Sequence, residues 1–282
     1  MTATPAARPA SDVDRVAEAH LEAVCRLDPV AATSMGVAGY DGDVPDLSPT
    51  GVEARAAAAR ATLDAVAALD PATFDDVDRV TVAALRERLG LEVELADAGE
   101  TLAPLNVIAS PVQDLRDVLD LMPTGTVEAW ENVASRLGGL PTAIDGYVES
   151  LRLAASRGEV AAVRQVAACA QQARELADPS SSFFASFVSG PEVDAVLDPS
   201  SSCALLRREL ESAAQDAAAA YGRLADMLEE ELAPQAPTVD AVGEERYSLW
   251  SRYFLGARVD LRETYEWGLE ELARVVADQE RT

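Results

Sequence analysis

The side chains that could do chemistry in this chain are mostly carboxylates. The 282 residues include 49 Asp and Glu but only one histidine, His20, and no lysine. A single histidine cannot supply both ligands of an HExxH zinc site, and the lack of lysine excludes a P-loop lysine and a Schiff-base lysine. The sequence also contains no GxSxG and no GxGxxG motif. The common hydrolase, nucleotide-binding and zinc-protease chemistries therefore have no complete residue set here.

The histidine and the cysteines are better explained by structure than by catalysis. His20 lies on the apolar stripe of the first predicted helix, so we expect a partly buried, hydrogen-bonded side chain. The three cysteines are far apart and form no CxxC pair; they are Cys25, Cys169 and Cys203. This spacing predicts reduced thiols in a cytoplasmic protein rather than a disulfide framework or a structural zinc site.

Two clusters of carboxylates stand out, and both have a structural explanation. The run Glu229-Glu230-Glu231 is typical of a solvated helix face. Asp75, Asp76 and Asp78 lie near a predicted helix start, where acidic groups compensate the helix dipole. We assign no catalytic residue and no metal ligand in this chain, although a carboxylate-based hydrolase stays open as a weaker hypothesis.

The chain is strongly acidic, with a formal charge of −26 from 23 arginines and 49 carboxylates. Such a surface repels phosphate backbones and anionic lipids, so we expect no nucleic-acid partner and no membrane partner. No apolar run reaches the ~18 residues that a membrane span needs. The acidity indicates solubility, with a site for cationic substrates or metals as the weaker alternative.

Helix signals recur along the sequence, whereas runs of alternating β-branched residues are absent. Caps, prolines and apolar periodicity predict helices over about 11–27, 48–69, 75–97, 110–122, 126–137, 140–157, 160–177, 203–233, 243–255 and 260–280. We expect a disordered lead at 1–11, a tolerated extended piece at 101–110, and a long connection or lid-like excursion at 178–202 with a short helix around 183–187. The predicted fold class is all-α, an array of long, mostly antiparallel packed helices.

The last predicted helix has a start signal but no stop signal. Asp260 and Glu263 have the capping-box spacing. Apolar residues then recur on one stripe, at Tyr265, Leu269, Leu272 and Val276. No Gly, Asn or Pro follows to end the helix. We therefore expect this chain to be the front part of something longer.

Three blocks of sequence, taken in order, carry a family resemblance. They are DPVAATSMG (28–36) followed by YDGDVPDLSPTG; NVIASPVQDLRDVLDLMP (106–123) followed by Trp130 and RLGGLPTAIDGYVESLRLAASRG (136–158); and VGEERYSLWSRYFLGARVDLRETYEWGLEELARV (242–275). Together they resemble a bacterial family catalogued as domain of unknown function 885. Each block is moderately specific, and the resemblance extends from about residue 12 onward.

The resemblance implies a zinc-dependent peptidase with a large, mainly helical fold. In that family an HExxH-type helix lies in the second half, where two histidines would bind zinc and a glutamate would activate water. This chain lacks that motif, so residues 12–282 resemble an N-terminal helical domain truncated at its C-terminus, and no catalytic residue carries over. Zinc is expected only in the missing C-terminal half, and this domain would form a wall of the substrate channel.

The partners implied are that missing half or a second copy of the chain, with peptide as a further ligand. The alternative is a stand-alone helical binding or scaffold protein derived from such a peptidase. Six of the 14 aromatic residues lie between 247 and 267. Four of them are candidates for the interface with the missing half, with a locally thick core as the alternative: Tyr247, Trp250, Phe254 and Trp267.

Five residues are candidates for contact with a peptide substrate. They are Gln113, Arg116, Asp117, Arg252 and Tyr253. Each also has a structural explanation. Arg116 has the spacing of an i,i+4 ion pair with Asp120, worth only ~0.3–0.5 kcal/mol, and buried packing would account for Arg252 and Tyr253.

Overall fold

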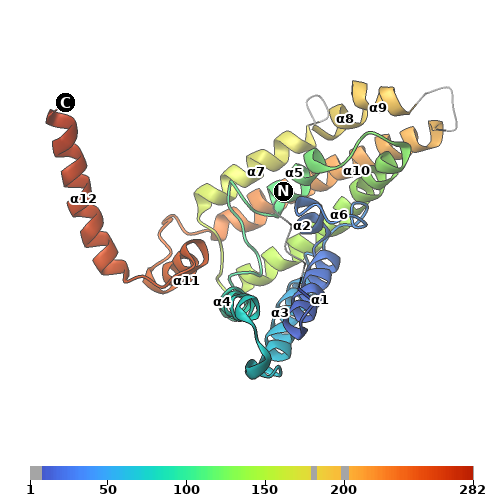
Figure 1. Ribbon diagram of the computed structural model, residues 1–282. Coiled ribbons are helices and arrows are strands. Elements are labelled where there is room, and N and C mark those ends of the chain that lie inside the picture. The colour runs from blue at the N-terminus through green and yellow to red at the C-terminus, as the bar shows by residue number, and fades with distance from the viewer. Residues whose placement is uncertain (1–7, 179–182, 198–202, 282) are drawn as a thin grey trace.

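The computed structural model describes residues 8–178, 183–197 and 203–281, and over these ranges the chain is helical, without a strand. The predicted all-α fold is confirmed. Helices α6 (Val127–Ser156), α7 (Val163–Ala177) and α10 (Ala204–Met227) lie side by side along the long axis of the body (Figure 1). Helices α1 (Asp12–Leu27), α3 (Pro49–Ala67) and α4 (Asp76–Asp97) form a second bundle beside them.

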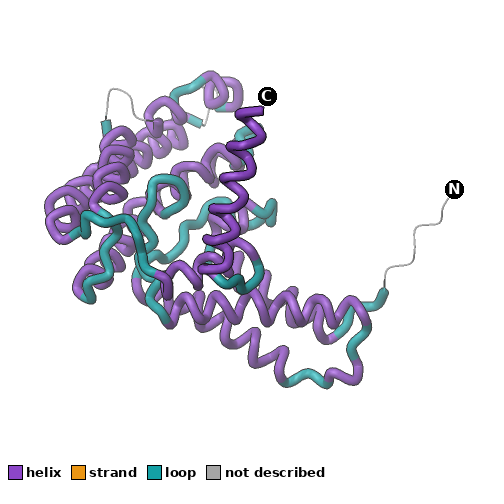
Figure 2. Tube along the Cα trace, turned by 90° about the vertical axis from the view of Figure 1, so that its left-hand side faces the viewer, coloured by secondary structure: helices purple, strands orange, loops and turns teal. Residues whose placement is uncertain are grey.

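Shorter elements complete the body and lead to a C-terminal arm. The short α-helices are α2 (Pro29–Ser34), α5 (Pro111–Asp117), α8 (Phe183–Val188) and α9 (Pro191–Val196). Single turns are η1 (Pro71–Thr73), η2 (Val118–Leu121), the π-helical η3 (Leu228–Leu232) and η4 (Ala233–Gln235). The arm consists of α11 (Glu244–Leu255), which lies beside α4, and α12 (Leu261–Arg281), which projects from the body (Figure 1). Figure 2 shows the molecule from the side on which α12 projects, so that this helix lies in front of the others.

The helix starts follow the predicted caps. The hydroxyl of Ser11 accepts a hydrogen bond from the amide of Asp14, and Ser48 accepts one from Gly51. Asp75 caps α4 through the amide of Asp78. Because these side chains pair backbone amides that have no partner inside the helix, they fix where each helix begins.

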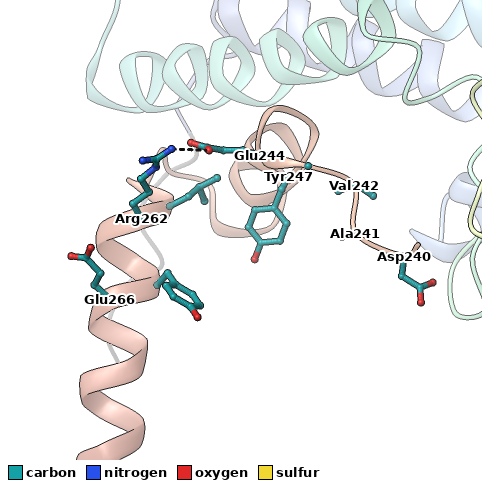
Figure 3. Close-up of a pocket in the computed structure, with 10 residues that line it drawn as sticks. Asp240, Ala241, Val242, Glu244, Tyr247, Arg262 and Glu266 are labelled. Carbon is teal, nitrogen blue, oxygen red and sulfur yellow. Dashed lines mark ion pairs between the residues drawn. The ribbon is translucent and has the colours of Figure 1, made fainter. Parts of the chain in front are cut away.

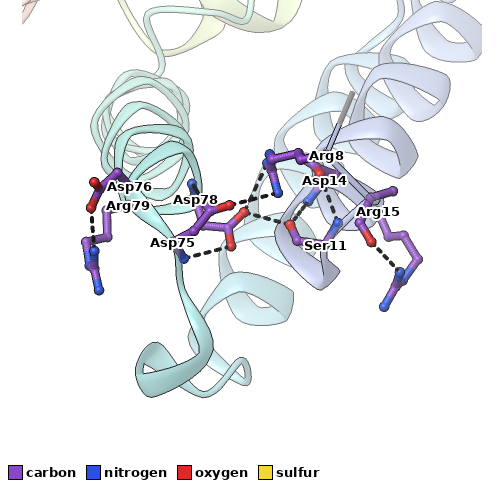
Figure 4. Close-up of polar contacts among 9 residues, drawn as sticks. Arg8, Ser11, Asp14, Arg15, Asp75, Asp76, Asp78 and Arg79 are labelled. Atoms are coloured by element: carbon purple, nitrogen blue, oxygen red, sulfur yellow. Dashed lines mark hydrogen bonds and ion pairs between the residues drawn. The ribbon is translucent and has the colours of Figure 1, made fainter. Parts of the chain in front are cut away.

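The N-terminal lead is held to this second bundle from Arg8 onward (Figure 4). Of the predicted disordered segment 1–11, residues 1–7 lie outside the described ranges. Arg8 forms ion pairs with Asp14, Asp75 and Asp78, and the Ser11 hydroxyl donates to Asp78 at 2.6 Å. Asp78 is buried, so these partners compensate its lost hydration.

Two helices were expected around Gly138-Gly139, but α6 is continuous from Val127 to Ser156, so that prediction is wrong. Leu137 and Leu140 are fully buried, and their packing outweighs the weak helix propensity of the glycines and of Pro141. The glycines also allow close approach: a Cβ on Gly146 would lie 2.9 Å from the amide nitrogen of Ser48.

The segment after α7 was expected to be a connection or lid-like excursion, and its described part is instead core. Residues 179–182 and 198–202 lie outside the described ranges. Between them, α8 and α9 bury Phe184, Val193 and Leu197 completely in the main core. The short helix predicted around 183–187 is confirmed as α8, whereas α9 was not predicted, because the sequence around it is rich in Ser and Pro.

One buried cation holds the loop that follows α2. Arg136 on α6 is fully buried and donates to the carbonyl oxygens of Pro29, Tyr40 and Asp43. It also donates to the hydroxyl of Thr33 at 3.0 Å. The guanidinium therefore joins α2 and the irregular loop that follows it to α6, and supplies donors to carbonyl oxygens of that loop.

Candidate functional site

The arm is built as an elbow between α11 and α12. Gly243 (φ 83°) precedes α11 and Gly256 (φ 67°) ends it in the left-handed conformation that glycine adopts without strain. Asp260 then caps α12, because its Oδ1 accepts from the amides of Arg262 and Glu263 at 2.9 and 3.0 Å. Gly256 and the Asp260 cap therefore lie at the bend between the two helices, whereas Gly243 lies at the other end of α11.

Arg252 ties the elbow to the body. It is 8% exposed, and its Nε and Nη2 donate to the two carboxylate oxygens of Glu87 on α4 at 2.7 and 2.9 Å. Its Nη1 donates to both oxygens of Glu94 at 2.9 and 3.0 Å. The hydrogen bond from Arg252 lowers the pKa of Glu87 below its ordinary 4.5. The Arg252 donors are therefore occupied by the protein itself.

The neighbouring aromatic residues of α11 also contact α4 and the turn that follows it through polar groups. The indole Nε1 of Trp250 donates to Glu100 at 2.8 Å. The guanidinium of Arg88 lies 5.1 Å from the ring centre of Tyr253 and donates to its carbonyl oxygen at 3.0 Å. Trp250 is half-buried, whereas Tyr247 and Phe254 are exposed. The contact between α11 and α4 is thus made mainly by charges, and part of the aromatic surface remains uncovered.

Helix α12 has no buried residue and carries an uncovered apolar stripe. The members of the stripe share one face at helical spacing and are 38% to 68% exposed: Tyr265, Leu269, Leu272, Val275 and Val276. Gly268 lies within the same stripe, with open space where a Cβ would be. Trp267 is exposed on the opposite face. An amphipathic helix with both sides uncovered is a surface available to a partner.

A pocket of about 690 Å³ occupies the inside of the elbow (Figure 3). Tyr247 points into the space between α11 and α12, and Arg262 pairs with Glu244 at 3.6 Å across its edge. Its apolar lining comes from Ala241, Val242, Tyr247, Leu261 and Tyr265. Since Leu261 and Tyr265 also begin the α12 stripe, the pocket and the stripe form one continuous apolar surface.

The candidates from α5 lie elsewhere, where α5 packs on α6 and α7. The Gln113 amide accepts from the backbone and hydroxyl of Ser110 at 2.9 and 2.7 Å and donates to Gln172 at 2.6 Å. Gln172 in turn donates to the carbonyl of Val107. These bonds hold residues 106–110, which belong to the segment 101–110 that was tolerated as extended, in a loop rather than a strand.

Arg116 and Asp117 form a surface cluster on the same helix. Arg116 pairs with Asp117 at 2.9 Å and with Asp120, the expected i,i+4 partner. Its guanidinium also lies 4.0 Å from the ring centre of Phe183. The neighbouring Asp114 has its pKa raised to about 6 by burial, with Asp28 and Asp117 adding repulsion. The α5 candidates and the α11 candidates pack on different elements.

The remaining reactive side chains behave as structural groups. His20 is half-buried, its Nδ1 lies 2.9 Å from the Thr62 hydroxyl, and burial lowers its pKa, so the predicted structural histidine is confirmed. Glu229 and Glu231 are exposed and pair with Arg174 and Arg152. Among the described residues, no three His, Cys, Asp or Glu side chains are grouped as metal ligands.

Sequence reasoning missed the acidic partners of Arg252. Glu87 and Glu94 are seven residues apart, so they share one face of α4, and that spacing was the available signal. Nothing local connects them with an arginine 158 residues further along the chain. Gly268 was also missed, although it stands between two members of the predicted stripe.

Comparison with known proteins supports a family and a fold. The sequence model of a family described as "Bacterial protein of unknown function (DUF885)" matches residues 29–282. A solved structure described as "the putative lipoprotein from Colwellia psychrerythraea" superposes with a TM-score of 0.74 at 15% sequence identity. The match covers 94% of this chain and 50% of that one, so this chain spans about half its length. A search of curated proteins gave no match.

Proposed function

The chain belongs to the DUF885 family of bacterial proteins, and on that premise we propose that it is the N-terminal, non-catalytic helical part of a zinc-dependent, peptidase-like hydrolase. One observation carries the proposal: almost the whole chain superposes on half of a solved structure of about twice its length. The family resemblance supplies the reaction class. In this role the helical body forms one wall of a peptide channel, and the second half supplies the rest.

On this proposal, zinc and the catalytic residues belong to the second half. The chain has one histidine, so it could not bind zinc in the HExxH manner. Its contribution would be to complete and orient a site whose chemistry is the activation of zinc-bound water. Positioning of this kind supplies a large part of catalysis when it holds a substrate near its reactive geometry.

The uncovered side chains of the arm are the proposed contact with that second half. Tyr247, Phe254 and Trp267 are each more than half exposed. Trp250 would contribute through the part of its ring that Glu100 and Tyr253 leave open. Large aromatic side chains are enriched at the centres of protein interfaces, which supports their burial by a partner.

For peptide contact, the proposal distinguishes two roles among the candidates. Asp117 and Tyr253 have exposed side chains and could contact peptide directly. Gln113, Arg116 and Arg252 make several contacts within the chain and would act by holding the 106–110 loop, α5 and α11 in place. None of these roles requires a residue that reacts.

Cytoplasmic location is also part of the proposal, supported by Cys25 and Cys169, which are buried thiols outside any disulfide. Over the described residues, no helix combines the length and apolarity that crossing a membrane requires.

A second candidate function rests on the quality of the core. Trp130, Phe184 and Tyr221 are fully buried in one continuous cluster that joins α5 through α10. A body so packed can fold without a second half, which favours a stand-alone helical binding or scaffold protein. This reading predicts cooperative unfolding and no exposed surface that binds a hydrophobic dye.

The purified chain decides between these readings. As the proposed half of an enzyme, it should bind no stoichiometric zinc, hydrolyse no peptide and bind dye through the arm. Zinc-dependent, chelator-sensitive hydrolysis by the chain alone would overturn the proposal. A monodisperse chain that binds no dye would favour the scaffold reading. Variants with Tyr247→Ser and Phe254→Ser should lower dye binding, and Tyr40→Ser, away from the arm, serves as a control.

A further inference from the structure

The apolar surface of the elbow, formed by the pocket and the α12 stripe, has the features of a binding site for one helix. The stripe on α12 runs from Tyr265 to Val276, and the pocket continues it through Leu261 to Tyr247. Apolar residues at this spacing are what a second helix buries in helix-on-helix packing. Because α12 buries none of its own residues in the body, the stripe has no partner among the residues that the structure describes.

Gly268 gives this stripe a defined crossing point. A glycine in the middle of an exposed helix costs about 1 kcal/mol relative to alanine. Here it stands between Tyr265 and Leu272 on the apolar face, with open space above it. A small residue in that position lets a second helix approach closely. Helix packing would therefore explain why a glycine is present despite its cost to helix stability.

The charges beside the stripe indicate the kind of helix that would bind. Glu266 and Glu280 border the stripe and form no ion pair with any residue that the structure describes. Arg274 is turned to the opposite face, where it pairs with Glu271 and Asp278. A partner helix would therefore meet unpaired carboxylates along one edge of the seam and would be matched by basic residues there.

A second copy of the chain fits this surface poorly. Each copy carries a formal charge of −26, and an antiparallel pair of α12 helices would bring Glu266 and Glu280 against their counterparts. Like charges at such positions oppose pairing. The charge pattern thus favours a partner that differs from this chain.

We infer that the elbow and α12 bind a single amphipathic helix with basic flanks, whose terminal large apolar side chain fills the pocket between Tyr247 and Tyr265. The inference rests on the proposed function in taking that helix from the second half of the fold. The pocket binds the anchoring side chain of the partner helix. Gly268 lets that helix approach α12 closely, and the bordering carboxylates select a helix with basic residues. Large apolar side chains that fill a pocket at the centre of an interface often contribute most of its binding energy.

The test uses the full chain and two synthetic helical peptides about three heptads long. Both have a leucine seam, but one has arginine flanks and the other glutamate flanks, and binding is followed by fluorescence anisotropy. The arginine peptide should bind at least about tenfold more tightly than the glutamate peptide. Leu269→Asp with Leu272→Asp should abolish binding of the arginine peptide.

Matched charge variants distinguish specific binding of the peptide at α12 from its general electrostatic attraction to an acidic protein. Glu266→Gln with Glu280→Gln should weaken the arginine peptide several-fold, whereas Glu263→Gln, on the opposite face of α12, should not. The inference would be overturned if Glu263→Gln weakened peptide binding as much as Glu266→Gln with Glu280→Gln does. Binding that survives Leu269→Asp with Leu272→Asp would overturn it as well. A dimer of the chain that Leu272→Asp dissociates would also overturn the inference, because a second copy would then occupy the binding site. Zinc content and peptidase activity play no part in this readout, so its failure is distinct from failure of the proposed function.

Discussion

Arg252 on α11 and Glu87 on α4 form a two-point ion pair, with both carboxylate oxygens accepting from the guanidinium at 2.7 and 2.9 Å. The pair spans 165 residues of sequence. It holds an arm whose apolar faces point away from the body, so the arm is fixed by charge and left uncovered by packing. This combination is what a preformed docking surface requires.

Removing this ion pair should loosen the arm without disturbing the body. In Arg252→Gln we expect the amides of α11 to exchange hydrogen about tenfold faster, because local opening no longer breaks the contacts with Glu87 and Glu94. Amides of α6 and α10 should be unchanged. Arg258→Gln is the control, since Arg258 is exposed and only 3.6 Å from the same Glu94. Equal effects of the two substitutions would contradict the role given to Arg252.

The buried guanidinium of Arg136 should contribute heavily to stability. Arg136→Met keeps much of the volume but leaves the carbonyl of Asp43 without its donor and removes one of the donors to each of the carbonyls of Pro29 and Tyr40. We expect a loss of about 3–5 kcal/mol in urea unfolding. Arg223→Met, which removes an exposed arginine 3.5 Å from Asp145, should change stability by less than about 0.5 kcal/mol. If Arg136→Met lowered the free energy of unfolding by less than about 1 kcal/mol, the structural role given to Arg136 would be contradicted.

Two glycines of α6 should respond in opposite directions to the same substitution. Gly138 has open space around a built Cβ, so Gly138→Ala should stabilise the chain by about 1 kcal/mol through helix propensity. At Gly146 the new methyl would lie 2.9 Å from the backbone of Ser48, so Gly146→Ala should destabilise by about 1–3 kcal/mol. Thermal unfolding measures the stability of both variants. A change of the same sign in both would contradict the close approach of Gly146 to the backbone of Ser48.

Acidification from pH 7.5 to 5.5 should weaken the fold through His20. Burial lowers the pKa of His20 below 6.5, so the unfolded chain takes up a proton before the folded chain does. Stability therefore falls as pH drops below 6.5, and His20→Gln should lack this loss. Urea unfolding at several pH values measures it.

Asp114 acts with the opposite sign in part of that pH window. Its pKa is raised to about 6, so the folded chain gains a proton first and is stabilised as pH falls through that value. The comparison is therefore made in an Asp114→Asn background. A pH profile that His20→Gln leaves unchanged there would show that His20 is not the titrating group.

The sequence predicted most of this fold because its helix starts are local. Ser11, Ser48 and Asp75 each precede a helix and cap it within three residues. The continuity of α6 could not be predicted in the same way. It depends on Leu137 and Leu140 packing in the core, and local glycine and proline signals point against it.

The candidate site was predictable only in part for the same reason. The α12 stripe follows from spacing alone, and Tyr247 and Phe254 are exposed. The ion pairs of Arg252 join segments that are distant in sequence, and no local pattern indicates which carboxylates it meets. Similarly, Phe184 and Val193 in the short helices α8 and α9 are buried in a core cluster that includes residues of α6 and α10.

The most direct test of the central claim, that this chain is the non-catalytic half of a zinc-peptidase-like protein, is to read the genomic DNA that follows codon 282 in all three frames. The account predicts a stretch that encodes an HExxH-type helix within a length comparable with that of this chain. The absence of such a motif would contradict the claim and leave the helical binding protein as the function to pursue.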